Sequence, residues 1–412
     1  MKISRFALSL AILSCAVVAL TVATIAAPRQ SVALIKHRFM PPFSSEQTAS
    51  TGTSNPTTAE PPVRRPSTKP CTVNIASQEP FENYNIHDFN FTPPTGCRGP
   101  WSKVVLNADY HVRGRQFDRT VTMWVAGVDI YRGTTAEPTK AGIRWHVEKD
   151  VTEYSAIFKD PRIIAIGLGN TVNSTYTGII YGTFCLQFYP ANEDNPAPRV
   201  PDAVYPLASN TVGGYGDFTL VGPGDTAHAT FNLPRNIERA FLDVYTQSQI
   251  ADEFWYTCVP NTLANELFTC GGTSFREGEV SVDGRMAGVA PVFPWIYTGG
   301  IDPYLWRPTP GVEAFNFHPY RVNLTPFAAP LSNGKPHTIA VSVYNANNYF
   351  LADGVLLLYL DHGTARVNGA LVNDYITLPS PVSPATSNWI PKDTPAAPLT
   401  SRCSARSKFQ AT

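Results

Sequence analysis

Alternation of apolar and polar residues dominates the chain between Cys71 and His362. Short runs in which every second side chain is apolar are separated by Gly, Pro, Asn and Asp. A period of two is typical of half-buried β-strands. No run keeps the 3.6-residue period of an amphipathic helix long enough to predict one. The pattern therefore predicts an all-β fold.

Two series of strands are expected on either side of a proline-rich seam at 190–206. The first series covers 104–112, 120–131, 143–151, 163–168 and 179–188, and the second covers 229–233, 240–245, 279–282, 320–324, 338–344 and 355–361. Tight turns are predicted where glycine follows an acidic or amide residue, at Asp283-Gly284, Asn333-Gly334 and Asp353-Gly354. The two series predict two adjacent antiparallel sandwiches.

The ends of the chain differ from this middle part. Residues 1–27 hold an apolar run after Lys2 and Arg5, which predicts a signal peptide or an uncleaved signal anchor. Residues 28–70 are rich in Pro, Ser and Thr and predict a disordered tether. The domains are then expected at 71–195 and 196–365, with a C-terminal tail at 366–412. The protein is expected to be exported, and to be secreted, on the cell surface or periplasmic.

Charge and cysteine content limit the partners and the cofactors that the protein is expected to have. The 32 basic and 32 acidic residues cancel without a basic stripe, so nucleic acid is not an expected partner. Any contact with a membrane is expected only through the N-terminal segment. Six cysteines outside the export signal predict disulfides, with Cys71–Cys97, Cys258–Cys270 and Cys185–Cys403 as the candidate pairs. The chain has no CxxC or HExxH motif, so no metal site or cofactor is expected.

One run, GRQFDRTVTMWVAGVDIYRGTTAEP at 114–138, joins a strand pattern to charged ends. Alternation places Val121, Met123 and Val125 on one face. Asp118 and Arg119 then lie where the strand begins. An Asp beside an Arg at a strand end is more often an ion-paired surface feature than a catalyst. The alternation alone favours that structural interpretation.

Two further clusters lie in the second series. IADEFWYTC contains Glu253 and Trp255, and GGTSFREGE contains Arg276 and Glu277. Ordinary loop acids are as good an interpretation of these clusters as function. Carboxylates from separate loops, with arginines nearby, could activate a water molecule and stabilise a developing oxyanion. The aromatic loop PWIYTGGIDPYLWRP, with Trp306, suits either sugar stacking or core packing.

A series of motifs resembles a known family. GRQFDR, GTTAEP, WHVEKDVT, NSTYTG, DEFWYT, FREGEVSVDG, TGGIDPYLW, AFNFHPYRVNLTPF and NGKPHTIAVSVYNANNYFLADGVLLLYLDH are similar, in this order, to the peptide-N-glycosidase A family. A more distant similarity joins the chain to peptide-N-glycosidase F. The resemblance implies two jelly rolls and an acid-active amidase. Its substrates would be N-linked glycopeptides and glycoproteins, cleaved between Asn and the first N-acetylglucosamine without a metal.

The resemblance also implies roles for single residues. Asp118, in the triplet Phe-Asp-Arg, matches the position of the principal catalytic aspartate, and Glu277 or Glu253 is expected to be the second acid. Substrate contacts are expected from Arg119, Glu137, Asn170, Trp255, Arg276 and Trp306. Two alternatives stay open, a carbohydrate-binding double jelly roll without catalysis and a glycoside hydrolase that uses the same carboxylates.

Overall fold

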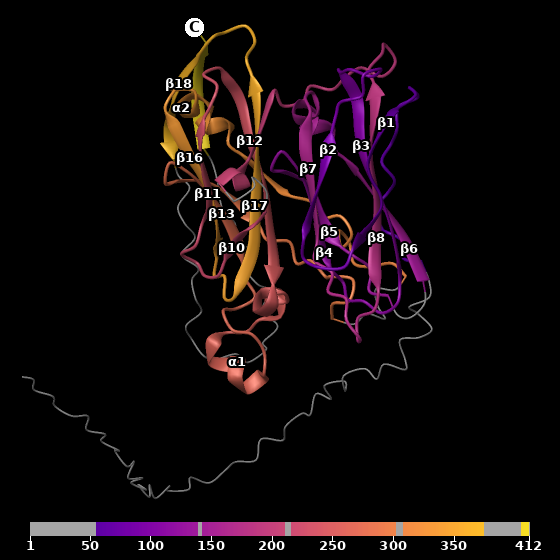
Figure 1. Cartoon of the computed structure of the whole chain (residues 1–412). Coiled ribbons are helices and arrows are strands. Elements are labelled where there is room, and N and C mark those ends of the chain that lie inside the picture. Colours follow the sequence, from indigo (N-terminus) through magenta and orange to yellow (C-terminus); the bar gives the residue numbers. More distant parts are fainter. Residues whose placement is uncertain (1–54, 139–141, 211–215, 302–307, 375–404, 412) are drawn as a thin grey trace, which may run out of the picture. The chain divides into compact units, whose positions relative to one another are not determined.

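The first half of the chain folds into two four-stranded antiparallel sheets. The structure is a computed structural model that describes residues 55–138, 142–210, 216–301, 308–374 and 405–411. The strands are β1 (Cys71–Phe81), β2 (Ile86–Phe91), β3 (Trp101–Arg113), β4 (Thr120–Val125), β5 (Val128–Thr134), β6 (Gly142–Asp150), β7 (Arg162–Leu168) and β8 (Ile179–Pro190), with a 3-10 helix η1 (Thr152–Phe158). One sheet has the order β1-β8-β3-β6 and the other β2-β7-β4-β5 (Figure 1). This is the strand order of a jelly roll.

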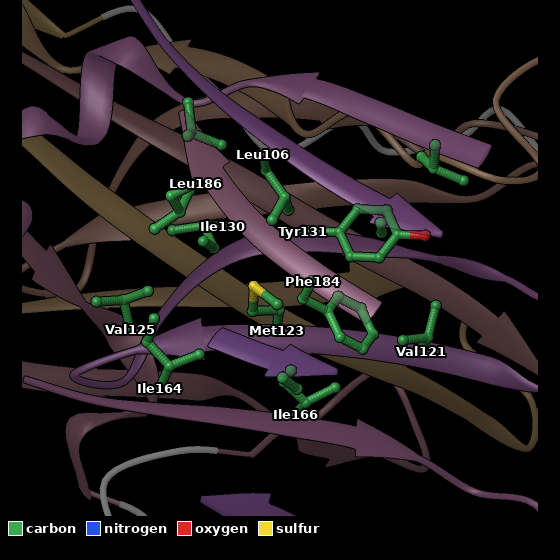
Figure 2. Close-up of a cluster of buried hydrophobic side chains, with 14 of the residues drawn as sticks. Leu106, Val121, Met123, Val125, Ile130, Tyr131, Ile164, Ile166, Phe184 and Leu186 are labelled. Atoms are coloured by element: carbon green, nitrogen blue, oxygen red, sulfur yellow. The ribbon is translucent and has the colours of Figure 1, made fainter. Parts of the chain in front are cut away.

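The two sheets enclose one hydrophobic core. Val121, Met123 and Val125 of β4 lie in it, which confirms the face predicted from alternation. Ile164 and Ile166 of β7 also belong to this core, and Leu106, Phe184 and Leu186 from the other sheet complete the cluster (Figure 2). The outer face of β4 is also largely buried.

The single strand predicted at 120–131 is wrong, because the chain reverses direction in its middle. Val125 of β4 pairs with Val128 of β5 in an antiparallel ladder. Ala126 and Gly127 both adopt positive φ, 49° and 84°, as a two-residue hairpin turn with a right-handed twist requires. An Ala-Gly pair within an apolar run is a weaker turn signal than Asn-Gly, so the pattern concealed the turn.

The second half repeats the same strand order. Its strands are β9 (Ala203–Pro206), β10 (Phe218–Leu220), β11 (Ala227–Asn232), β12 (Ile237–Gln249), β13 (Glu277–Val282), β14 (Arg285–Pro291), β15 (Tyr320–Asn323), β16 (Pro336–Tyr344) and β17 (Tyr349–Leu360). One sheet runs β10-β17-β12-β15 with β9 also on β17, and the other runs β11-β16-β13-β14. A second core lies between them. The fold is therefore two antiparallel jelly rolls, and we propose 71–195 and 196–365 as their limits.

Short helices fill the connections of the second jelly roll. They are η2 (Leu207–Asn210), η4 (Ile250–Asp252), η5 (Trp255–Thr257), α1 (Asn261–Leu267), η6 (Thr325–Phe327) and α2 (Ala328–Leu331). Within the described residues, no helix is long and apolar enough to cross a membrane.

Two of the three predicted turns are confirmed. Asp283-Gly284 joins β13 to β14 with both φ angles positive, and Gly334 has a φ of 84° just before β16. Asp353-Gly354 instead lies inside β17, where Asp353 pairs with Tyr245 of β12. This prediction is wrong because Asp353 is fully buried and its carboxyl group belongs to a polar layer between the jelly rolls.

Parts of the predicted tether and tail are ordered. Asn55 accepts a hydrogen bond from the backbone of Arg144 at 2.9 Å, and the Val63 backbone donates to Glu148 at 3.1 Å. Both partners lie on β6, the edge strand of its sheet, so an extended segment can cover that edge. In the tail, β18 (Val367–Asp374) pairs with β19 (Ala405–Ala411). The predicted signal segment lies outside the described residues.

The cysteines follow two of the expected pairings. Cys71 is bonded to Cys97 and Cys258 to Cys270, which confirms both predictions. Cys185 has no disulfide partner within the described part of the chain. Cys403 lies outside that part, so the third pair stays a prediction.

Candidate active site

Asp118 lies in the extended segment that leads into β4, and it faces a loop of the second jelly roll. The backbone N–H of Gly299 donates to Oδ2 of Asp118 at 2.9 Å. These two residues are 181 positions apart in sequence. The site therefore depends on the contact between the two halves of the chain.

Glu137 shares this position with Asp118. A Cβ atom placed on Gly299 would come within 1.9 Å of Oε2 of Glu137 and 3.2 Å of Oδ2 of Asp118. Two carboxyl groups from the first jelly roll thus contact one glycine of the second. Only a residue without a side chain fits between them, which explains the glycine at position 299.

Threonines fix the backbones on both sides. The Thr298 hydroxyl donates to the backbone carbonyl of Thr135. Thr135 in turn accepts from the Arg119 backbone through its hydroxyl at 2.8 Å and donates its own N–H to the Arg119 carbonyl at 2.7 Å. The segments that carry Asp118, Glu137 and Gly299 are consequently held together by buried hydrogen bonds.

Glu253 is the second acid that the structure brings to Asp118. It follows η4 at the end of β12, in the loop DEFWYT. Burial raises the pKa of Glu253 to about 7, and the negative charge of Asp118 adds to this effect. Two nearby acids with separated proton affinities can act as a base and an acid in one reaction.

Glu277, the rival candidate, lies at the start of β13. Burial and the neighbouring charge of Glu279 on the same strand raise its pKa. Asp118 is not among the causes of that shift. Of the two candidates for the second acid, the electrostatic influence of Asp118 therefore favours Glu253 over Glu277.

Arg119 does not extend toward the second jelly roll. Its guanidinium donates from Nε to Oε1 of Gln116 at 3.0 Å. It also lies over the rings of Phe117 and Tyr176, 5.4 and 5.8 Å from their centroids. Phe117 and Tyr176 pack against each other at 4.2 Å, and Phe117 is 39% exposed. Asp118 is therefore flanked by a partly exposed aromatic and cationic surface.

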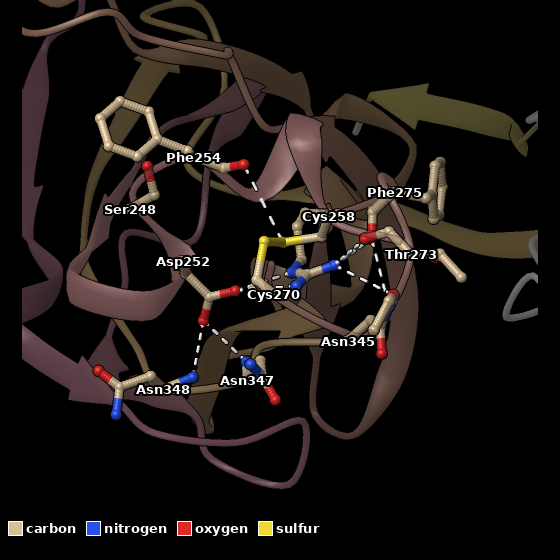
Figure 3. Close-up of polar contacts among 12 residues, drawn as sticks. Ser248, Asp252, Phe254, Cys258, Cys270, Thr273, Phe275, Asn345, Asn347 and Asn348 are labelled. Atoms are coloured by element: carbon tan, nitrogen blue, oxygen red, sulfur yellow. Dashed lines mark hydrogen bonds and ion pairs between the residues drawn. A yellow bond between two sulfur atoms is a disulfide. The ribbon is translucent and has the colours of Figure 1, made fainter. Parts of the chain in front are cut away.

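Arg276 is buried and bonded within the second jelly roll, and its expected contact with substrate stays a prediction. Its fully buried guanidinium donates to Oδ1 of Asp252 at 3.0 and 2.9 Å. Its remaining donor group bonds the backbone carbonyls of Gly272, Thr273 and Phe275. Asp252 also accepts from the backbones of Asn347 and Asn348, as Figure 3 shows. The network anchors the loop that carries Glu253.

Asn170 and Trp255 are also buried. Asn170 donates to the carbonyls of Phe81 and Gly178 at 2.7 and 3.1 Å, so its amide holds two backbone segments. Trp255 belongs to the second hydrophobic core. Neither residue presents its side chain to solvent, because each satisfies the packing of its own jelly roll.

In the aromatic loop, too, the rings that the structure describes are buried. Trp295 and Tyr297 form a small buried cluster with Tyr245 and Phe317, which matches the core-packing alternative. Trp306 lies outside the described residues. Gln116, Thr298 and Gly299 also contribute to the site, but no chemical property of their side chains identifies them in the sequence. Their only signal is their place inside the motifs GRQFDR and TGGIDPYLW.

The chain matches known proteins in sequence over most of its length. The profile described as "Peptide N-acetyl-beta-D-glucosaminyl asparaginase amidase A" matches residues 61–374. The peptide-N4-(N-acetyl-beta-glucosaminyl)asparagine amidase A of Prunus dulcis is 38% identical over 341 residues, which cover 78% of this chain. The match spans 60% of the relative's own length.

Among the solved structures that resemble this chain, PNGF-II shows the same fold. PNGF-II in space group P21 superposes with a TM-score of 0.50 at 14% identity, covering 71% of this chain and 66% of that one. PNGase F from Flavobacterium meningosepticum gives a TM-score of 0.43 at 12% identity, over 70% of this chain and 96% of its own. At 14% identity the PNGF-II match supports the fold alone. The sequence matches go further, and by them the chain belongs to the peptide N-acetyl-β-D-glucosaminyl asparaginase amidase A family.

Proposed function

We propose that this protein is an amidase that hydrolyses the bond between Asn and the first N-acetylglucosamine of N-linked glycopeptides and glycoproteins. Family membership supports the reaction. The single structural observation that carries it is the placement of Asp118 and Glu253, from different jelly rolls, close enough for the charge of one to raise the pKa of the other. The products are a peptide with Asp in place of Asn and a glycosylamine.

The chemistry divides between the two acids. Asp118 orients a water molecule and takes its proton as the oxygen attacks the amide carbonyl carbon. The Gly299 N–H holds the Asp118 carboxylate in place. Glu253 begins as the neutral acid and gives its proton to the departing nitrogen when the carbon–nitrogen bond breaks. Exchange with solvent then returns both carboxyl groups to their starting states.

The residues around this pair suit a glycan. Glu137, which lies beside Asp118 at Gly299, supplies acceptors for sugar hydroxyl groups. The stack of Arg119, Phe117 and Tyr176 offers a flat surface for the C–H face of a sugar ring. We propose Glu137 and Arg119 as substrate-binding residues on these grounds.

Activity at acidic pH follows from the same arrangement. Because the pKa of Glu253 is raised to about 7, the acid form required for catalysis is present below that pH and is lost above it. The two disulfides support a location outside the reducing cytosol. The protein would then be exported, and it would be secreted, at the cell surface or periplasmic.

The test compares paired variants on a defined Asn-linked glycopeptide. Asp118→Asn and Glu253→Gln should bind the glycopeptide with little change and fail to convert it. Glu277→Gln is the matched control, since it makes the same chemical change at the rival acid and should retain turnover. Conversion by Asp118→Asn at the wild-type rate would refute the assignment of Asp118.

A further inference from the structure

A layer of buried charged residues lies where the two jelly rolls meet. Asp129 and Arg132 come from β5 of the first, and Asp217 and Asp353 come from the second. Asp129, Arg132 and Asp353 are fully buried, and the Asp217 side chain is 13% exposed. One carboxyl oxygen from each of the three aspartates lies within 4.8 Å of the others.

Arg132 joins the two sides. It donates from Nε and Nη2 to Oδ2 of Asp129 at 2.9 and 2.7 Å. Nη1 donates to Oε1 of Gln247 on β12 at 3.0 Å, and Nη2 also forms an ion pair with Asp217. Another buried cation, Lys149, donates to the Tyr245 hydroxyl at 2.9 Å rather than to a carboxylate.

The hydrogen bonds leave two carboxyl oxygens of this layer without a partner. Oδ1 of Asp353 accepts from the Gly354 backbone at 2.7 Å, but Oδ2 of Asp353 makes no hydrogen bond within the described residues, and neither does Oδ1 of Asp129. Arg132 forms ion pairs with the other two aspartates, and its charge favours the ionised form of Asp353 only in part, against burial and two neighbouring carboxylates. A buried carboxylate oxygen that no donor satisfies is strongly unfavourable.

We propose that Asp353 is a protonated carboxylic acid in the folded protein and that its O–H donates a hydrogen bond to the carboxylate of Asp129. A single shared proton would then join the two jelly rolls. The hydrogen bond would use both oxygens that otherwise have no partner. It would also reduce the layer from three negative charges to two, facing Arg132 and, further away, Lys149.

The surrounding electrostatics agree with a retained proton. Burial, and then the charges of Asp129 and Asp217, raise the pKa of Asp353 well above that of an ordinary aspartate. Burial is also the largest cause that raises the pKa of Asp129, to about 6. Burial lowers the pKa of Lys149 to about 8. The other titratable or charged groups that contribute at this layer are Tyr154 of η1, Asp243 and Tyr245 of β12, and Arg321 of β15.

The layer is connected to the candidate active site. Gln247, which accepts from Arg132, is followed on β12 by Ser248, whose backbone carbonyl accepts from the Tyr297 hydroxyl. Tyr297 lies two residues before Gly299, which binds Asp118. Loss of the shared proton would therefore act on β12 next to the residues that hold the Gly299 loop, and it would make the stability of the fold depend on pH separately from catalysis.

The pH dependence of stability has a definite sign. The folded state keeps the proton at pH values where an unfolded aspartate has lost it, so it binds more protons than the unfolded state above about pH 4. Stability must then fall as pH rises, by up to about tenfold in the unfolding constant per pH unit for one proton. Asp353→Asn keeps a donor at the same place without a titrating proton, and should remove this slope.

The experiment uses the full chain in urea unfolding between pH 4 and pH 8, together with infrared spectra of protein carrying carboxyl-13C aspartate. Wild type should show a protonated-carboxyl band at pH 7, above the pKa of about 6 of Asp129, and this band should be absent in Asp353→Asn. Asp243→Asn is the matched control. Asp243 is equally buried, but Arg321 donates to both of its oxygens at 2.6 and 2.7 Å, so the band should persist in this variant.

Three results would overturn the proposal. The first is the absence of a protonated-carboxyl band in wild type at pH 7, a measurement that does not depend on whether any variant folds. The second is an unfolding profile of Asp353→Asn that runs parallel to wild type across the pH range. The third is stabilisation of wild type, but not Asp353→Asn, by millimolar calcium, which would assign the layer to a cation.

Discussion

Replacing Gly299 with alanine probes the site through one methyl group. Gly299 has no positive φ, so its backbone accepts alanine without strain. The new Cβ, however, would lie 1.9 Å from Oε2 of Glu137 and 2.8 Å from its carboxyl carbon. Ordinary contact begins near 3.4 Å. The Glu137 carboxyl group must therefore move away, and Asp118 must move by a few tenths of an ångström.

The displacement sets the expected loss of activity. Glu137 must move by about 1.5 Å to reach ordinary contact distance. A misplacement of about 1 Å in an active site can lower the rate roughly 100-fold. That loss corresponds to about 2.7 kcal/mol of transition-state stabilisation. Gly299→Ala should thus reduce kcat/KM for a glycopeptide by about two orders of magnitude. Its urea unfolding midpoint should stay close to that of wild type, because the crowded atom is the mobile end of a side chain.

Two further variants make this prediction specific. Gly224→Ala is the control, since a Cβ there meets nothing within 4 Å, and it should leave kcat/KM unchanged. Glu137→Asp shortens the crowded side chain, so adding it to Gly299→Ala should recover part of the lost activity in a double-mutant cycle. Gly299→Ala with activity within twofold of wild type would refute the proposed geometry.

Other predictions concern the acids and the network behind them. The kcat/KM of wild type should fall as pH rises through about 7, the pKa of Glu253, and NMR titration of Glu253 in Asp118→Asn should give a lower pKa because a negative charge has been removed. Glu277→Gln should keep kcat/KM within about twofold of wild type; a hundredfold loss would restore Glu277 as the second acid. Arg276→Met leaves Asp252 buried without its cation and should lower the free energy of unfolding by about 3–5 kcal/mol in urea, whereas an unchanged midpoint would contradict the anchoring role.

Local patterns in the sequence predicted the all-β fold and the core face of β4 correctly, but they missed one turn and predicted another that does not form. Alternation correctly placed Val121, Met123 and Val125 in the core, because a strand with one face on a core must repeat with period two. The same logic failed at Ala126-Gly127, because both flanking strands are apolar and the two turn residues do not interrupt the apolar pattern. Asp353-Gly354 failed for the opposite reason: an Asp-Gly pair usually indicates a turn, but here the carboxyl group is required inside a strand by partners from the other jelly roll.

The candidate site was only partly predictable for a similar reason. Asp118 could be singled out because its triplet matches a family motif, and Glu253 because acids stand out in an aromatic loop. The choice between Glu253 and Glu277 depended on which loop end meets Asp118, and that is set by packing between residues more than a hundred positions apart. Gly299 contributes only a backbone N–H and an absent side chain, so no chemical property of its sequence identified it.

The most direct test of the proposed function is hydrolysis of a purified Asn-linked glycopeptide in water enriched in 18O, with mass spectrometry of the peptide and the sugar. We predict that wild type releases the whole glycan and leaves Asp carrying one 18O atom, and that Asp118→Asn and Glu253→Gln do neither. A peptide that keeps a sugar residue on Asn, or one that binds and is recovered unchanged, would contradict the account.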